Sequence, residues 1–203
     1  MTNHSKQCRQ CGKTFIPTRT TQIVCSPRCA TKMATASAKA KKVAERELTR
    51  ARRESLKTIA DRIKEAQTEF NAYIRLRDAG QPCICCGRTA NDRDLITGSR
   101  WDAGHYRSTG SAGHLRFNED NCHRQLVVCN RHGAGRAVDY RIGLIARIGL
   151  ERVEALEANN ASHKWTHGKL IEILATYKAK RKALEAKPAP ATTAARIPDH
   201  LPF

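Results

Sequence analysis

The chain has 203 residues, of which 40% are hydrophobic but only 5% aromatic, and its formal net charge is +18. This length allows one or two small domains, and the scarcity of aromatic side chains favours helices and small cores over a large β-sandwich. Because ordinary small domains have net charges of magnitude about 2 to 8, the excess of positive charge indicates a polyanionic partner, with nucleic acid ahead of an acidic membrane surface.

The cellular compartment can be inferred from two absences in the sequence. No apolar run approaches the roughly 20 residues that a membrane span needs, and the start MTNHSKQCRQCGKTF has no apolar signal core. We therefore expect a cytoplasmic protein that has no membrane partner. In a reducing compartment, its nine cysteines are expected to bind metal rather than to form disulfides.

The first predicted unit, residues 1–33, is a four-cysteine zinc finger. Cys8 and Cys11 form a knuckle with two residues between them, and Cys25 and Cys29 follow after thirteen intervening residues. Four thiolates at this spacing can close a tetrahedral Zn²⁺ site, and the metal then replaces a core that so short a segment cannot build. Because the protein supplies all four ligands, this zinc is expected to be structural; free buried thiols are the alternative.

Residues 34–79 contain no glycine or proline and predict one long helix. Its second half carries an apolar stripe with helical spacing, formed by Leu56, Ile59, Ile63, Ala66, Phe70 and Tyr73 or Ile74. Its first half is basic, with ten Lys and Arg against four Asp and Glu from Lys39 to Lys64. We expect this half to lie along a phosphate backbone, although a solvated charged helix fits the same pattern. The predicted DNA contacts are Lys41, Lys42, Arg46, Arg50, Arg52 and Arg53.

Residues 80–135 are predicted to hold a metal-assisted phosphodiesterase site. Cys83 and Cys86 form a second knuckle, and Cys129 follows about forty residues later. Between them, RWDAGHYRS is typical of a hairpin strand that ends in the glycine-bearing turn STGSAG. Phosphodiester hydrolysis needs a base to activate water and a cation to stabilise the leaving oxygen. His105 could be that base, and the cation could be held by Asp102, Asn130 and His123.

Two resemblances extend this interpretation. The run Asn121 to Asn130 resembles the second half of the HNH (ββα-metal, treble-clef) nuclease motif, and its cysteine followed by asparagine is similar to the phage Holliday-junction resolvase endonuclease VII. Nearly the whole chain resembles the lambdoid phage NinG (Rap) recombination proteins. That likeness rests on the four-cysteine finger, the basic helix and the blocks PCICCG, WDAGHYR, LRFNEDN, VVCN and YRIGLIARIG. The family implies a structure-specific endonuclease for Holliday junctions and D-loops.

The HNH resemblance assigns roles to three residues. It implies that His105 is the general base, that Asn121 orients the loop holding this histidine, and that Asn130 is a metal ligand. One departure concerns Gly104, because many HNH sites have Asp or His directly before the base. Asp102 is the candidate replacement for that ligand.

A second departure concerns Leu126, which stands where the family pattern QCVVCN has the first cysteine of the knuckle. A zinc held by Cys83, Cys86 and Cys129 then lacks a fourth ligand. Cys122, His132 and Cys85 are three alternative replacements, and a weak, three-ligand or absent zinc is a fourth outcome. Cys122 also fits the role of a small buried hydrophobe, and His114, in a glycine-rich turn, is expected to be exposed.

Residues 136–187 predict C-terminal helices. One runs from about 136 to 148 and another from about 150 to 158, separated at Gly149, and a third begins at the N-cap Thr166. Residues expected to pack the first of these against the apolar stripe are Val138, Ile142, Ile145 and Ile148. Additional phosphate contacts are predicted at Lys178, Lys180, Arg181 and Lys182. Residues 188–203 lack periodicity and predict a disordered tail.

The sequence thus predicts an α+β, mostly helical protein. We expect a metal-dependent endonuclease with one or two structural Zn²⁺ ions and a catalytic Mg²⁺ or Mn²⁺. Its expected partners are branched DNA, a second copy of the chain, and host or phage recombination proteins. The rival interpretation is a noncatalytic zinc protein that holds branched DNA for a partner enzyme.

Overall fold

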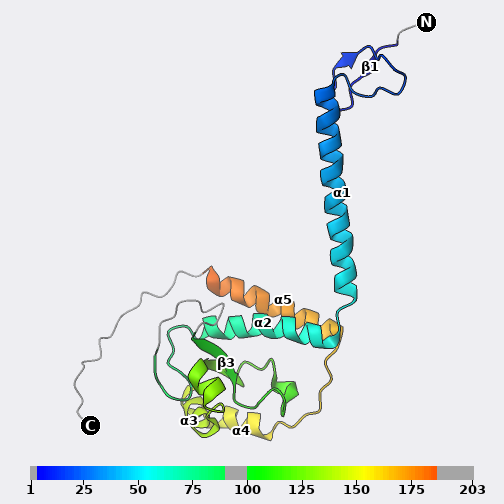
Figure 1. The fold of residues 1–203 in the computed structure, drawn as a ribbon. Helices are drawn as coiled ribbons and strands as arrows, with labels where there is room; N and C mark the ends of the chain where they lie inside the picture. Colours follow the sequence, from blue (N-terminus) through cyan, green and yellow to red (C-terminus); the bar gives the residue numbers. More distant parts are fainter. Residues whose placement is uncertain (1–3, 90–99, 187–203) are drawn as a thin grey trace, which may run out of the picture. The chain divides into compact units, whose positions relative to one another are not determined.

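The computed structural model describes residues 4–89 and 100–186, and the chain divides into two compact units, Met1–Lys57 and Thr58–Phe203. Helices dominate both units, and each unit adds one two-stranded antiparallel sheet (Figure 1). The predicted α+β, mostly helical class is therefore confirmed. The tail 188–203 lies outside the described residues. Among the described helices, none combines the length and apolar character needed to cross a bilayer.

The first unit has almost no apolar core. Strands β1 (Lys6–Gln7) and β2 (Thr14–Phe15) pair antiparallel, and the helix α1 (Pro27–Ser55) follows. The side chain of its N-cap, Ser26, accepts a hydrogen bond from the amide of Cys29. No residue of α1 is buried, and the only buried residues described in this unit are Cys8 and Val24.

The predicted single helix over residues 34–79 is wrong, because the chain forms two helices. Helix α1 ends at Ser55, and α2 (Ile59–Arg77) begins after the N-cap Thr58. Thr58 and Asp61 form a capping box, in which each side chain bonds to the other residue's backbone amide. This exchange satisfies amides that a helix start leaves without partners, and it starts a new helix without glycine or proline. Leu56 consequently leaves the apolar stripe and is 71% exposed.

The core of the second unit lies between α2, α5 (His167–Glu185) and a β-hairpin. Helices α2 and α5 run side by side with β3 next to them (Figure 1). The buried ring of Phe70 on α2 makes edge contacts with Tyr177, at 4.7 Å between ring centroids, and with Phe117, at 5.7 Å. Helix α5 begins at Thr166, whose hydroxyl accepts from the amide of Lys169 at 3.3 Å, so the predicted N-cap is confirmed.

The hairpin positions the residues of the predicted site. Strands β3 (Trp101–His105) and β4 (Cys122–Leu126) pair antiparallel, with Asp102 opposite Gln125 and His105 opposite Cys122. Their connection includes the short 3₁₀ turn η1 (Gly113–Leu115), and β4 leads into η2 (Val128–His132), a π-helical turn.

Helices α3 (Ala137–Ile148) and α4 (Leu150–Ala158) meet at Gly149, in agreement with the sequence pattern. The predicted inner face of α3 is partly wrong, because Val138 and Ile142 are 76% and 64% exposed. Tyr140 and Leu144 point inward instead and pack against α4 and Ile84 rather than against the α2 stripe. The stripe is covered by α5 and the hairpin.

Candidate functional site

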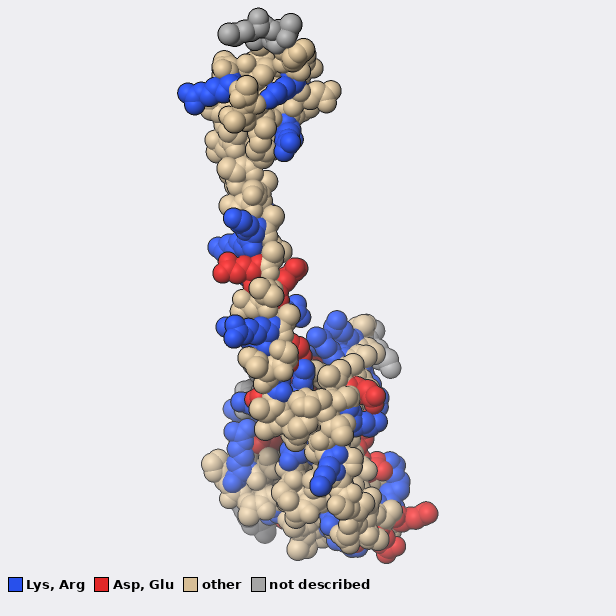
Figure 2. Space-filling view, turned by 90° about the vertical axis from the view of Figure 1, so that its right-hand side faces the viewer, with Lys and Arg blue, Asp and Glu red and all other residues tan. Residues whose placement is uncertain are grey.

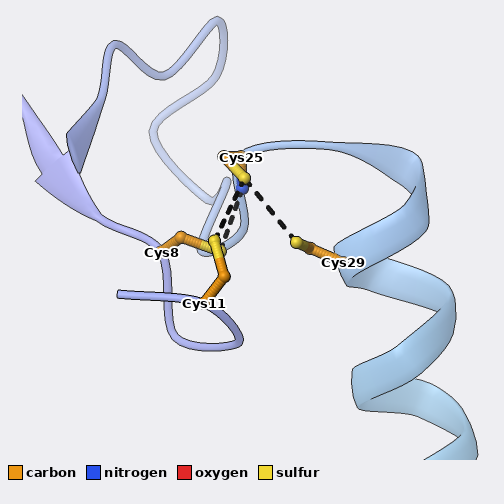
Figure 3. Close-up of side chains that lie close together, drawn as sticks. All are labelled: Cys8, Cys11, Cys25 and Cys29. Atoms are coloured by element: carbon orange, nitrogen blue, oxygen red, sulfur yellow. Dashed lines mark hydrogen bonds between the residues drawn. The ribbon is translucent and has the colours of Figure 1, made fainter. Parts of the chain in front are cut away.

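The four N-terminal cysteines converge in the first unit, and their sulfur atoms lie within 4.8 Å of one another. Figure 3 shows Cys8 and Cys11 on one turn, Cys25 before the helix, and Cys29 on the first turn of α1. Cys25 Sγ lies 3.6 Å from Cys11 Sγ and 3.7 Å from Cys29 Sγ, and the amide of Cys25 donates to Cys8 Sγ at 3.3 Å. This group of thiols could hold a zinc ion.

The electrostatics of this cluster favour a cation. Burial by itself raises the pKa of the Cys8 thiol. Hydrogen bonds from backbone amides, led by that of Cys25, outweigh this effect and lower the pKa to about 6. Hydrogen bonds with the thiols of Cys11, Cys29 and Cys8 raise the pKa of Cys25 to about 12. Without a metal, deprotonation of one thiol therefore makes deprotonation of its neighbours less favourable. A divalent ion removes this effect because it binds all four as thiolates.

A second cluster lies in the other unit, where the sulfur atoms of four cysteines again fall within 4.8 Å. Its members are Cys83, Cys85, Cys86 and Cys129. The Cys83–Cys85 and Cys86–Cys129 sulfur pairs are each 3.6 Å apart, and the amide of Leu126 donates to Cys83 Sγ at 3.2 Å. Of the three alternative fourth ligands, the structure brings in Cys85. The side chain of Leu126 packs against the cluster with Trp101.

The other candidate metal ligands, Cys122, His123 and His132, lie outside this cluster, as does His114. Cys122 is fully buried in the core under α2, and burial raises the pKa of its thiol well above the ordinary value, which fits a small hydrophobe. His123 is 3% exposed, and burial lowers its pKa to about 4. His132 is exposed on η2. His114 is half-buried rather than exposed, and its Nε2 donates to the carbonyl of Asn159 at 2.8 Å.

His105 stands at the end of β3 in one defined tautomer. Its Nε2 lies 2.9 Å from the carbonyl oxygen of Arg116, which can only accept, so Nε2 carries the proton. Nδ1 therefore keeps its lone pair, and its neighbour is Cys122 Sγ at 3.7 Å, a weak donor at long range. Burial lowers the pKa of His105, so the ring is neutral near pH 7. A neutral imidazole with a free nitrogen has the protonation state of a general base.

Asn121 fastens the loop that follows His105. It is fully buried, its Oδ1 accepts from the amide of Arg107 at 2.8 Å, and its Nδ2 donates to the carbonyls of Arg107 and Leu115 at 3.0 and 3.2 Å. A single side chain thus ties the end of β3 to η1. Its place in the structure is that of an orienting residue rather than a ligand.

Asp102 and Asn130, the two predicted cation ligands, lie next to each other. Asn130 Nδ2 donates to Asp102 Oδ2 at 2.9 Å. The carboxylate also accepts two bonds from Arg131, at 2.8 and 2.7 Å. Because side chains alternate along a strand, Asp102 and His105 leave β3 on opposite faces. The sequence interpretation did not include Arg131, whose guanidinium neutralises the acid.

A ligand residue in place of Gly104 would require the Gln125 side chain to move. A Cβ built there would lie 2.0 Å from Gln125 Oε1. The Gln125 side chain is buried, and its Nε2 donates to the carbonyl of Gly135 and to Cys85 Sγ. Its Oε1 has no hydrogen-bond partner among the described residues. A buried carbonyl oxygen therefore occupies the position where many HNH nucleases carry a ligand side chain, and nothing in the sequence pattern pointed to it.

The predicted DNA contacts fall into two groups. The six basic residues of α1 are exposed, and no ion pair joins them to an acid among the described residues. Figure 2 shows blue side chains along α1, with red side chains among them. Lys180 and Arg181 differ, because they pair with Glu119 at 2.5 Å and with Glu69 at 2.8 Å. These pairs fasten α5 to the core, whereas Lys182 is exposed.

The comparisons with known proteins identify the family. A family model described as Bacteriophage Lambda NinG protein matches residues 2–187. The chain belongs to the NinG family. It is 41% identical to Protein ninG of Escherichia phage lambda and 40% identical to Protein ninG of Salmonella phage P22, and each match covers 88% of this chain and 93% of the relative. No solved structure matches the chain. The resemblance to NinG is thus confirmed, and the names of these NinG relatives state no enzymatic activity.

Proposed function

We propose that this member of the NinG family is a metal-dependent, structure-specific DNA endonuclease with an HNH-like core, related in design to endonuclease VII and the Rap proteins. Its substrates are branched recombination intermediates such as Holliday junctions and D-loops. The observation that carries the proposal is the state of His105, which is neutral, held through Nε2 by a carbonyl, and unprotonated at Nδ1, where it meets only the weak thiol donor of Cys122 at 3.7 Å. The hairpin that presents it adjoins the second cysteine cluster, which could hold zinc, and is clamped by Asn121.

In this function His105 takes a proton from water for in-line attack on phosphorus. The bond to the Arg116 carbonyl stabilises the imidazolium that results, because Nε2–H donates more strongly when the ring is charged. Asn121 keeps the loop, and with it that carbonyl, in place through its contacts with Arg107 and Leu115. Positioning of this kind preserves the alignment on which the rate depends.

A divalent cation, Mg²⁺ or Mn²⁺, would stabilise charge on the leaving oxygen. The oxygens offered to it are those of Asp102, Asn130 and Gln125, and oxygen donors suit such hard ions. Gln125 Oε1 is buried without a partner among the described residues, so a cation would satisfy it. The fit requires three adjustments. The phosphodiester must reach around the end of β3, since Asp102 and His105 leave that strand on opposite faces. The Asn130 amide must turn to present Oδ1, and Arg131 must release Asp102.

DNA would be held mainly by the first unit. The exposed cations of α1 and the proposed zinc finger suit phosphates. The part of the chain that the structure describes has no module for reading paired bases, which fits recognition of DNA shape. Symmetric cutting of both strands of a junction favours a homodimer, for which α1 offers 29 residues that are nowhere buried. Host or phage recombination proteins are further partners in this proposal.

A second function is favoured by two specific contacts. Gln125 fills the space beside Gly104, and Arg131 neutralises Asp102. Both contacts would suit a scaffold that has lost its catalytic cation. Such a protein would bind branched DNA for a partner enzyme without cutting it.

Cleavage of labelled four-way junctions, D-loops and linear duplex, with Mg²⁺ or Mn²⁺, separates the two functions. The variants are His105→Ala and, as a matched control, His167→Ala, which changes an exposed histidine at the start of α5. We expect the wild type and the control to cut branched DNA, and His105→Ala to cut about 10² to 10⁴ times more slowly while binding equally well. Binding by all three proteins without any cleavage would establish the accessory function instead.

A further inference from the structure

A groove of about 420 Å³ lies beside the loop that holds His105. The loop contributes His114, Phe117 and Asn118 to its lining. The opposite wall comes from the segment before α5 and the first turns of that helix, with His163, Trp165, Lys169, Glu172, Ile173, Thr176 and Tyr177. Its size falls in the range of about 300 to 1,000 Å³ that is typical of sites for small organic ligands.

The aromatic rings of this groove form a corner. Trp165 meets Phe117 at 5.0 Å between ring centroids and an interplanar angle of 77°. It meets His163 at 4.1 Å and 67° on another side. Trp165 is only partly buried, so part of the indole remains available to a ligand. A flat ring can therefore lie against the indole while its edge faces a second ring.

The polar groups of the groove suit the edge of a base. Lys169 and Glu172 pair at 3.2 Å on the outer side of α5, where both remain well exposed. A carboxylate repels phosphate but accepts hydrogen bonds from the ring N–H or exocyclic amino groups on the edges of bases, including N3–H of thymine. Lys169 next to it can contact the phosphate of the same nucleotide. This combination of an aromatic platform with paired charges fits a nucleobase better than a bare phosphate.

The groove also lies next to the proposed catalytic base. Phe117 follows Arg116, whose carbonyl accepts the hydrogen bond from His105. The buried ring of Phe70 lies near both the proposed catalytic base and the groove. Its centroid is 6.1 Å from that of the His105 ring and 5.7 Å from that of the Phe117 ring. A nucleotide bound in the groove would thus lie within about one residue's length of the loop that positions His105.

We propose that this groove binds an unpaired nucleobase of a DNA strand, stacked on Trp165, and so positions a branch point next to His105. The proposal deepens the proposed nuclease function and rests on it for the role of His105. A base inside a duplex is stacked on both faces and cannot enter, whereas bases at a branch can leave the stack at lower cost. The groove would therefore distinguish branched from linear DNA.

Tryptophan fluorescence tests base binding without any cleavage. The chain has two tryptophans. Trp101 is fully buried under Arg124, so a base bound in the groove should change the emission of Trp165 alone. The probes are a (dT) single strand, an abasic strand of equal length and a fully paired linear duplex, without added divalent cation. We expect the (dT) strand to quench the emission, and neither of the other probes to do so. Equal quenching by the abasic strand, or none by any probe, would overturn the proposal.

Three variants separate stacking from phosphate binding. Trp165→Ala should bind the (dT) strand about 5 to 150 times more weakly, the range expected for loss of one base–aromatic stack. Trp165→Phe, which keeps an aromatic face, should lose less. Ile171→Ala, on α5 but outside the groove, is the matched control and should bind like the wild type. Affinity for the abasic strand should stay unchanged in all three, and a Trp165→Ala loss that is equal for both strands would contradict stacking.

The outcome is distinguishable from that of the nuclease test. Quenching that persists in His105→Ala supports the groove whether or not the wild type cuts DNA. Two results together would disprove base binding in the groove: no quenching in the wild type, and junction cleavage by Trp165→Ala at the wild-type rate. The proposed nuclease function would remain supported. Melting temperatures of the variants show whether loss of the Trp165–Phe117 contact has unfolded the protein.

Discussion

The two units of this chain are held together in different ways. Among its described residues, the first unit buries only Cys8 and Val24, and its six predicted DNA-contacting cations make no ion pair with a described acid. The second unit buries Phe70, Tyr140 and many other apolar side chains, and several of its cations, such as Lys180 and Arg181, pair with acids. The same types of residue therefore stabilise the fold in one unit and stay at the surface in the other. In the proposed function, the cations that the fold does not use are the ones that contact DNA.

The two cysteine clusters show the same contrast. The first is partly exposed, with Cys11 at the surface, and little else holds its segment together. The second has Cys83 and Cys129 buried against Trp101 and Leu126, next to a large core. A metal in the first cluster would thus substitute for a core, whereas a metal in the second would be added to one.

Removal of zinc should give the largest difference between the units. Structural zinc contributes roughly 10 to 16 kcal/mol in finger peptides, and residues 4–26 have no comparable apolar burial. We expect a chelator to abolish the dispersed amide signals of that segment in ¹H–¹⁵N spectra, while most signals from α2 and α5 persist. Dispersed signals of residues 4–26 in metal-free protein would show that the finger folds by itself.

A pair of cysteine variants should sharpen the assignment of the second cluster. Cys85→Ser removes a sulfur from the cluster, and Cys122→Ala removes one from the core beneath α2. We expect Cys85→Ser to lower the zinc content from two ions to one per chain, because a hydroxyl is a poor replacement for a thiolate ligand. Cys122→Ala should keep both ions and lose only packing. Native mass spectrometry counts the ions, and two zinc ions in Cys85→Ser would exclude this ligand.

Charge substitutions should separate cations that bind DNA from those that stabilise the fold. Replacing Arg46, Arg50 and Arg53 on α1 by Gln should reduce the slope of log affinity against log salt by roughly 3, at about 0.9 per phosphate contact. Replacing Lys180 and Arg181 by Gln should lower the melting temperature more than the slope, because both pair with acids of the core. The salt dependence of affinity is measured for both variants on the same four-way junction, so that their slopes can be compared directly. Equal slopes in the triple variant and the wild type would remove α1 from the interface.

Local patterns in the sequence predicted much of this architecture. Cysteine spacing predicted the first cluster, and alternation of side chains predicted strand β3. Thr166 and Gly149 predicted helix boundaries. Each of these signals is contained in a short stretch of sequence. The break at Thr58 was also local, since Thr58 and Asp61 have capping-box spacing, but the absence of glycine and proline concealed it. The inner face of α3 was partly wrong because Val138 and Ile142 have no element over them.

The remaining features of the site depend on contacts between distant segments. Cys85 joins the second cluster only because the knuckle turns toward η2, and spacing alone left it equal to two alternatives. Arg131 on Asp102 and Gln125 over Gly104 are set by the register of β3 with β4 and by the path of η2. The groove at Trp165 requires the chain before α5 to reach Phe117, about fifty residues earlier in the sequence. Hydrophobic periodicity carries no information on such approaches.

The pH dependence of cleavage should show the smallest effect and tests whether the chemistry resides in the second unit. Burial lowers the pKa of His105 below its ordinary value of 6.5, and a general base works only while neutral. As the pH falls through 6.5 the base therefore stays unprotonated, and the rate should decline only when the pH drops below the lowered pKa. Junction cleavage measured from pH 8 downward, with the wild type and His167→Ala as a matched pair, locates this decline. Far-UV circular dichroism at each pH verifies that the fold persists. A decline centred at or above pH 6.5 would mean that an exposed group, and not the buried His105, accepts the proton.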